Sequence, residues 1–195
     1  ASIVLRQKKQ RLIETALQYG AQEIQLDYIR FNSKQPASSE HAITIKKIIQ
    51  SFKNRLDSEK IPLQIDVFGI TAYGEEKHIG QSIPLFASSV DTVCPMVYPS
   101  HYVPFEDHYT HPYKTVYDSL VSIKEQFDGK MPVKLNPFIE LSNYHYPHQS
   151  HEEKLKYIYA QIQAAQDAGV DGWYAWSASN YYDNLFKVLE NYPVK

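Results

Sequence analysis

Two stretches of the sequence place an aspartate in the same setting. EIQLDYIRF (23–31) contains Gln25 and Asp27, and PLQIDVFG (62–69) contains Gln64 and Asp66. Each stretch alternates polar and aliphatic residues with the period of two that a β-strand produces, so each glutamine shares a face with its aspartate. Two carboxyl groups on neighbouring strands can act on one substrate, one as a nucleophile and the other as a general acid/base.

The elements that must position these aspartates alternate along the chain. Strand-like stretches cover 23–31, 62–69, 91–98, 132–139 and 171–177, and helix-like stretches cover 5–19, 38–56, 81–88, 112–127, 152–168 and 182–192. Such alternation predicts βαβ units and a parallel sheet covered by helices. Neither a G-x-G-x-x-G fingerprint nor a P-loop occurs, and acids, aromatics and hydroxyls stand at the strand ends instead. This favours a barrel, in which the loops after the strands converge on one face.

Composition narrows the classes of function. We expect a single domain over 1–195, because no linker or low-complexity segment interrupts the chain. The net charge of −2 predicts no binding to nucleic acid, and no apolar run reaches the roughly 20 residues of a membrane span. The one cysteine, Cys94, excludes an internal disulfide. The 16 tyrosines suit amphipathic ligands such as sugars.

Several stretches, in order along the chain, carry a family resemblance: DYIRF (27–31), DVFG (66–69), PMVYPSHY (95–102) and GWYAWSASNYY (172–182). They resemble a bacterial family of glycoside hydrolases with a TIM-barrel domain, distantly similar to α-amylase-like retaining glycosidases. The resemblance implies a partial (β/α)₈ barrel in which the five βα units correspond to strands four to eight. We then expect an N-terminal segment or another chain to supply strands one to three. It also implies a carbohydrate substrate, no cofactor and an extracytoplasmic location.

On this reading, Asp27 is the nucleophile and Asp66 the general acid/base of a retaining mechanism. The other reading is that one or both are buried, hydrogen-bonded acids, for which Arg30 is one available partner. Arg30 itself either orients Asp27, binds a sugar hydroxyl or forms a structural salt bridge. The remaining residues expected to bind substrate are Tyr98, His101 and Tyr102 after the third strand, Glu140 after the fourth, and Trp176, Asn180 and Tyr181 at the fifth.

Three points stay open at this stage. Glu140 stands where the family carries an amide, so it is also an alternative acid/base. A non-catalytic carbohydrate-binding or scaffold module would keep the cleft without turnover. A metal-dependent polysaccharide deacetylase or hydrolase would rest on the loop histidines His108, His111, His145, His148 and His151. Their Pro- and Tyr-rich loops lack the usual partners of a zinc site, so we predict no metal site.

Overall fold

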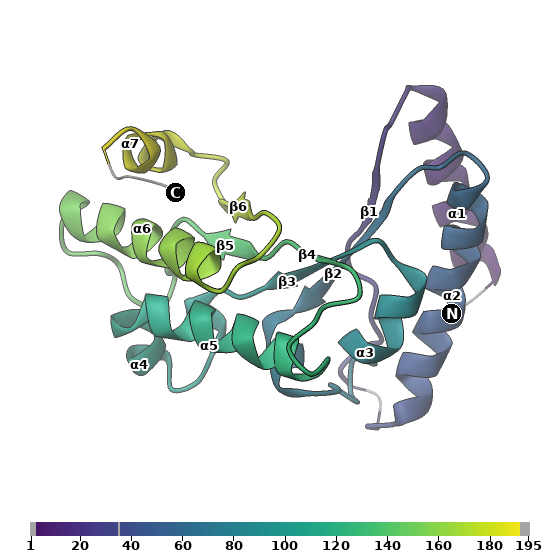
Figure 1. Ribbon diagram of the computed structural model, residues 1–195, viewed down its shortest axis with the longest axis horizontal. Helices are drawn as coiled ribbons and strands as arrows, with labels where there is room; N and C mark the ends of the chain where they lie inside the picture. Colours follow the sequence, from purple (N-terminus) through teal and green to yellow (C-terminus); the bar gives the residue numbers. More distant parts are fainter. Residues whose placement is uncertain (1–2, 35, 192–195) are drawn as a thin grey trace.

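The computed structural model describes residues 3–34 and 36–191, and its strands form one parallel sheet (Figure 1). The order along the sheet is β1-β2-β3-β5-β6, and β4 also pairs with β3. β4 and β5 therefore share one strand position, which gives five positions alternating with helices. The expected partial (β/α)₈ barrel is confirmed. The strands are β1 (Ile24–Leu26), β2 (Leu63–Phe68), β3 (Thr92–Met96), β4 (Lys134–Leu135), β5 (Phe138–Glu140) and β6 (Tyr174–Trp176).

The helices cover the outer side of this sheet (Figure 1). One group, α1 to α3, packs beside β1 and β2, and a second group, α4 to α6, lies on the other flank. The bounds are α1 (Ile3–Gln18), α2 (Ser39–Asp57), α3 (Ile83–Phe86), α4 (Phe105–Thr110), α5 (Pro112–Glu125), α6 (His151–Asp167) and α7 (Asp183–Asn191), with short 3₁₀ turns η1 (Gly69–Tyr73), η2 (Ala87–Ser89) and η3 (Pro99–His101). None of the helices in the described ranges is long and apolar enough to cross a membrane.

The sheet curls into a half-barrel, and one hydrogen bond across its concave face shows how strongly the sheet is curved. The side-chain amide of Gln64 on β2 donates to the hydroxyl of Tyr174 on β6 at 2.9 Å. β3 and β5 lie between these strands, so a flat sheet would hold them about 14 Å apart at 4.8 Å per strand. Curling brings their inner faces together. Cys94 on β3 also donates its thiol to Gln64, at 3.0 Å, which leaves it an inert buried residue.

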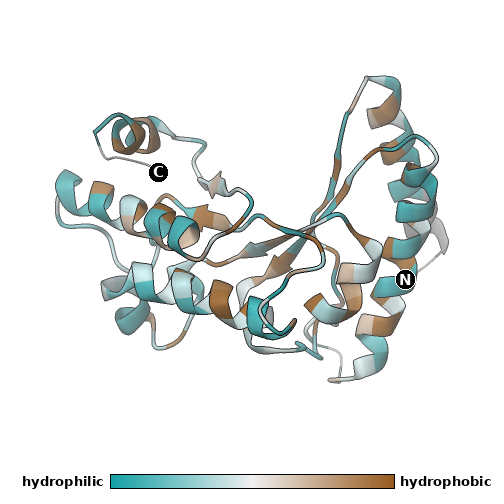
Figure 2. Ribbon diagram, viewed as in Figure 1, coloured by the Kyte–Doolittle hydropathy of each residue, from teal (hydrophilic) through white to brown (hydrophobic). Residues whose placement is uncertain are grey.

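Aliphatic packing between helices and strands holds this curl in place. The side chain of Ser38 caps α2 by accepting a hydrogen bond from the Glu40 amide. From there one face of α2 packs against the sheet, and burial of each large apolar side chain contributes roughly 1.5–3 kcal/mol. The brown residues of Figure 2 lie on the strands and alternate with teal residues along the helices. The buried residues of α2 are Ala42, Ile45, Ile49, Phe52 and Leu56.

Some expected elements differ from those observed. The strand expected over 23–31 ends at Leu26, because Asp27 accepts a hydrogen bond from the Tyr28 amide and Tyr28 turns into the left-handed region at φ 55°. The strand expected over 132–139 breaks between β4 and β5 at Asn136 and Pro137, since proline has no N–H for the ladder. Helix α4 lies in a stretch expected to be a loop. The expected end of the last helix, Tyr192, lies outside the described residues.

Candidate active site

A cavity of about 260 Å³ lies at the carboxyl ends of the strands. Every strand position of the sheet contributes to it, as the convergence of βα loops on one face of a barrel predicts. Both aspartates singled out in the sequence line this cavity, together with the aromatic residues of β3 and β6. The lining residues are Asp27, Tyr28, Asp66, Phe68, Gln81, Met96, Tyr98, His101, Phe138 and Trp176.

The register of β1 and β2 brings the two aspartates side by side. Leu26 pairs with Ile65, so Asp27 and Asp66 each follow at the next position. Neighbouring parallel strands lie about 4.8 Å apart, and a retaining glycosidase needs its two carboxyl groups about 5–5.5 Å apart. Strand geometry therefore brings the backbones of the two aspartates to a separation from which their carboxyl groups can reach the spacing of a retaining pair.

Asp66 lies in a setting that favours the protonated form of its carboxyl group. It is 7% exposed, and its Oδ1 accepts a hydrogen bond from the Gln25 amide at 2.6 Å. Burial raises the pKa of Asp66 from 3.8 to about 7; the hydrogen bond from Gln25 opposes this rise, and the nearby charge of Asp27 adds to it. A carboxyl group with a pKa near neutrality can donate a proton to a leaving group and later take one from water.

Asp27 lies at the more open side of the cavity. Its Oδ1 accepts the Tyr28 amide at 2.6 Å, and Tyr28 adopts φ 55°. A non-glycine residue in this region costs on the order of 1–3 kcal/mol and persists only where the surroundings enforce it. The turn directs the Tyr28 ring outward, 73% exposed, rather than onto the helices as the strand pattern suggested. The same turn fixes the Asp27 carboxyl group at the cavity mouth.

Aromatic rings form the opposite wall of the cavity. Tyr98 stacks on Trp176 with ring centroids 5.2 Å apart and planes at 20°, and His101 meets Tyr98 edge-on at 5.1 Å. Trp176 keeps 38% of its surface exposed, so it offers a ring face to a ligand. Trp173, which has the opposite strand parity, packs against the core under the helices. Burial lowers the pKa of His101, which keeps its imidazole neutral at pH 7.

Arg30 makes no ion pair with either aspartate within the described residues. Its guanidinium lies 5.5 Å from the ring centroid of Tyr28 and 5.6 Å from that of Phe68, and it donates to the carbonyl of Phe31 at 3.2 Å. The described residues therefore show no salt bridge between Arg30 and either aspartate, although Asp66 is buried and hydrogen-bonded, as the alternative reading holds for one or both acids. Arg30 contacts the rings of Tyr28 and Phe68, two residues that line the cavity.

Tyr102 and Glu140 are buried away from the cavity. Tyr102 packs on Gly69, and its hydroxyl accepts a hydrogen bond from Ser119 at 3.1 Å. Glu140 is fully buried: the Ser100 amide and hydroxyl and the Tyr157 hydroxyl donate to its two oxygens at 2.5–2.9 Å. With its oxygens engaged in this way, Glu140 ties η3 and α6 to the end of β5.

Asn180 and Tyr181 belong to the loop after β6 and are not among the residues that line the cavity. Asn180 adopts φ 53°, and the Tyr181 amide donates to the Ser177 hydroxyl at 3.1 Å. Tyr181 remains 51% exposed. The structure thus gathers Asp27, Asp66, Tyr98, His101 and Trp176 of the predicted set, and leaves Asn180 and Tyr181 in a neighbouring loop.

Sequence reasoning missed five lining residues: Tyr28, Phe68, Gln81, Met96 and Phe138. The strand alternation does indicate Phe68, because Phe68 shares the Asp66 face of its strand. Gln81 lies outside the strands, so the alternation gives no indication that it lines the cavity. Its side chain accepts the Phe68 amide at 2.8 Å and donates to the Ile29 carbonyl at 3.2 Å, which locks together the segments that follow β1 and β2.

The loop histidines take part in ring contacts and local hydrogen bonds. His108 bonds the Thr115 hydroxyl at 2.8 Å, His145 stacks on Phe105 at 3.9 Å, and His148 lies against Tyr109 and Tyr157. In the part of the chain that the structure describes, no three or more histidine, cysteine, aspartate or glutamate side chains gather to hold a metal ion.

The fold and the cavity place the chain in the class of α/β-barrel proteins that carry acids at the carboxyl ends of their strands. Within that class, residues 5–182 match a family model described as "Putative glycosyl hydrolase domain" (DUF4015), and the chain belongs to this family. No curated protein matches the chain. Among solved structures it is similar to the glycoside hydrolase domain of PgaB (BpsB) from Bordetella bronchiseptica, at 13% identity and a TM-score of 0.49. That similarity covers 77% of this chain and 40% of the other.

Proposed function

We propose that this protein hydrolyses glycosidic bonds of an oligo- or polysaccharide by a retaining mechanism, with Asp27 as the nucleophile and Asp66 as the general acid/base. One observation carries the proposal: a buried carboxyl group whose pKa rises to about 7 lines the same cavity as a second carboxyl group on the adjacent strand. Paired carboxyls with unequal environments are how glycosidases divide these two roles.

In the first step, Asp66 gives its proton to the glycosidic oxygen while Asp27 attacks the anomeric carbon, which forms a covalent glycosyl-enzyme ester. In the second step Asp66, now ionised, takes a proton from water as the water oxygen displaces Asp27. The sugar at the scissile bond would rest on the exposed face of Trp176, because its C–H-rich side packs well on an indole ring. His101 and Tyr98 would offer hydrogen bonds to its hydroxyl groups.

The sheet supports a further part of this proposal. β1 and β6 each have a partner on one side only within the described residues, and five strand positions form an arc that an eight-stranded barrel would close. We propose that an N-terminal segment or another chain supplies the remaining strands beside these edges. The intact mass and the oligomeric state of the protein, purified from the cells that produce it naturally, would distinguish an N-terminal segment from a second chain.

Turnover of a panel of aryl glycosides and soluble polysaccharides tests the mechanism. We expect activity in the wild-type protein and a loss of about 10³-fold or more in both Asp27→Asn and Asp66→Asn. Azide should rescue the Asp27→Gly variant as a glycosyl azide of inverted configuration, and the Asp66→Gly variant as one of retained configuration. Unchanged activity in either Asn variant would remove that residue from the mechanism. Saccharide binding without turnover by the wild type would favour a non-catalytic binding module.

A further inference from the structure

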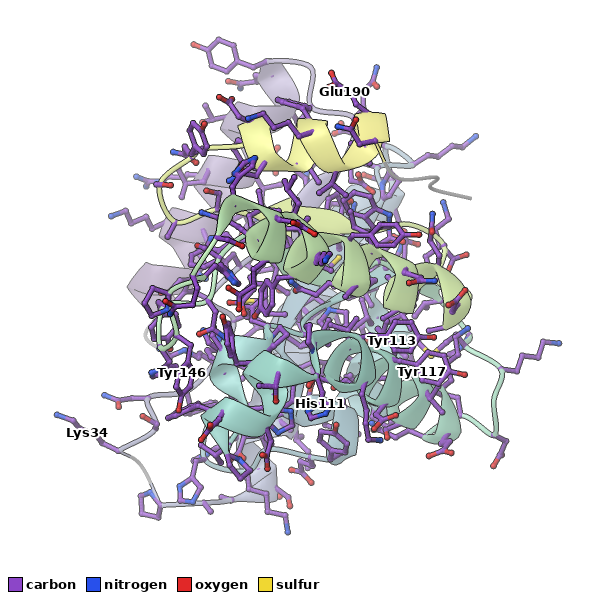
Figure 3. All side chains as sticks on the ribbon, turned by 90° about the vertical axis from the view of Figure 1, so that its left-hand side faces the viewer. Lys34, His111, Tyr113, Tyr117, Tyr146 and Glu190 are labelled. Atoms are coloured by element: carbon purple, nitrogen blue, oxygen red, sulfur yellow. The ribbon has the colours of Figure 1, made fainter. Side chains whose placement is uncertain are left out.

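A second concave surface lies on the outer helical layer. It is a groove of about 590 Å³, within the usual size range of ligand sites. One wall comes from the end of α4 and the start of α5, and includes Tyr109, His111 and Tyr113; the other comes from α6, and includes Glu153 and Tyr157. No residue lines both this groove and the Asp27/Asp66 cavity. Figure 3 views this face of the molecule, with His111 and Tyr113 labelled.

Two tyrosine rings of the groove are fixed by their hydroxyl groups. Tyr109 donates to Glu153 at 2.7 Å, and Tyr113 donates to Asp167 at 3.0 Å. Glu153 lies in the first turn of α6 and Asp167 is its last residue, so these two anchor points are about 21 Å apart at 1.5 Å per residue. The two hydroxyl groups are therefore anchored near opposite ends of α6, and the residues of α6 that line the groove run from Glu153 to Ala160. Rings held in place in advance lose little conformational entropy when a ligand binds.

The chemistry of the groove favours a neutral, hydroxylated ligand. Tyrosine rings present an apolar face with a polar edge, which matches the alternation of C–H and hydroxyl groups on a sugar. Each of the two rim lysines has a carboxylate neighbour, Asp118 for Lys114 at 2.5 Å and Glu152 for Lys156 at 2.6 Å, which offsets its positive charge and lowers the attraction of the rim for phosphate or sulfate. The imidazole ring of His148 in the groove wall packs against the rings of Tyr109 and Tyr157, which adds to the aromatic lining.

We propose that this groove is a second, non-catalytic binding site for an extended neutral oligosaccharide, such as a distant part of the polymer whose cleavage we propose at Asp27 and Asp66. The inference rests on that proposed function for its choice of ligand class. Its volume of about 590 Å³ and its fixed rings suit several consecutive sugar units better than a single one. A site of this kind would hold the protein on its polymer between cleavage events.

The test uses the Asp66→Asn protein, so that binding is measured without turnover. Its mobility is followed by affinity gel electrophoresis in hydroxyethyl cellulose, soluble starch, xylan and glycol chitin. Tyr109→Ala and Tyr113→Ala are added singly to remove the groove rings, and Trp176→Ala to remove the ring of the cavity. Tyr19→Ala is the matched control, because Tyr19 is 89% exposed at the end of α1 and lines neither site. Circular dichroism confirms that each variant is folded.

We expect at least one glycan to retard the Asp66→Asn protein, and each groove variant to weaken that binding about five- to tenfold. The Tyr19→Ala variant should keep all of it, and Trp176→Ala should remove only the part that the Asp27/Asp66 cavity contributes, so that groove binding persists. Retardation that Trp176→Ala abolishes and the groove variants leave unchanged would overturn the groove proposal. Absence of retardation in all four glycans would also overturn it. Failure of turnover in the wild-type protein, by contrast, speaks against the proposed function and leaves this binding measurement intact.

Discussion

The side-chain amide of Gln25 donates a hydrogen bond to the carboxyl group of Asp66 across two adjacent strands, at 2.6 Å. Both residues stand on the inner face of the sheet, at positions that the parallel register of β1 and β2 brings close together. The bond stabilises the ionised form of Asp66 and so opposes the rise in pKa that burial causes. Gln25 therefore tunes the acid that we assign to proton transfer.

The first prediction concerns this tuning. Activity that needs protonated Asp66 should fall as the pH rises above about 7, the pKa of that group. Gln25→Ala removes the opposing hydrogen bond, so the pKa should rise and the alkaline limb of kcat/KM should move by about half a unit to one unit to higher pH. The pH–rate profile measures this shift. Gln10→Ala, an exposed glutamine of α1, is the control and should leave the profile in place.

A second prediction concerns stability. The unfolded state loses the Asp66 proton near 3.8 and the folded state near 7, so the folded state binds more protons between these values. Folding stability should therefore fall as the pH rises through this window, because ionised Asp66 is costly to bury. Asp66→Asn should stabilise the protein by about 1–3 kcal/mol at pH 8 and by little at pH 4, in chemical denaturation at both values. An equal effect at both pH values would contradict this origin.

The close approach of Gly69 and Tyr102 gives a third prediction. A Cβ at position 69 would overlap the Tyr102 hydroxyl and crowd the Met96 carbonyl. Gly69→Ala should therefore destabilise the protein by about 1–3 kcal/mol through overpacking. The double variant Gly69→Ala/Tyr102→Phe should recover part of this loss, since it removes one of the two clashing atoms. Urea denaturation measures all three proteins. A double variant no more stable than Gly69→Ala would show that the backbone clash dominates.

Glu140 supports the fourth prediction. Its oxygens accept hydrogen bonds from Ser100 and Tyr157 in a fully buried site, so Glu140→Ala should cost about 2–5 kcal/mol by leaving these donors without an acceptor. Because Ser100 is in η3 next to His101, saccharide affinity should also fall. Thermal unfolding and glycan affinity measure the two effects. Glu190→Ala, which removes an exposed acid on α7, should change neither the stability nor the affinity. A Glu140→Ala protein of wild-type stability would show that Glu140 does not hold η3 and α6 to β5.

Much of this arrangement follows from local sequence. The alternation of Gln25 with Asp27, and of Gln64 with Asp66, predicts the inward face of two strands, and the parity of Trp173 and Trp176 separates the core ring from the cavity ring. What escaped prediction depends on contacts between distant segments. Glu140 stands near the carboxyl end of a strand as the aspartates do, and only its contacts with Ser100 and Tyr157, 40 and 17 positions away, show that it is engaged in packing. Tyr102 follows the same third strand as His101, yet its ring turns back onto Gly69.

The hydrogen bond between Gln64 and Tyr174 has a consequence for how the two sides of the cavity are held relative to each other. It joins β2 to β6 across the concave face of the half-barrel, at a residue two positions before Asp66 on the same face of β2. Tyr174 and Trp176 both belong to β6, so this bond links the strand of Asp66 directly to the strand of Trp176. The acid and the ring of the proposed site are thereby fixed to each other as well as within their own strands.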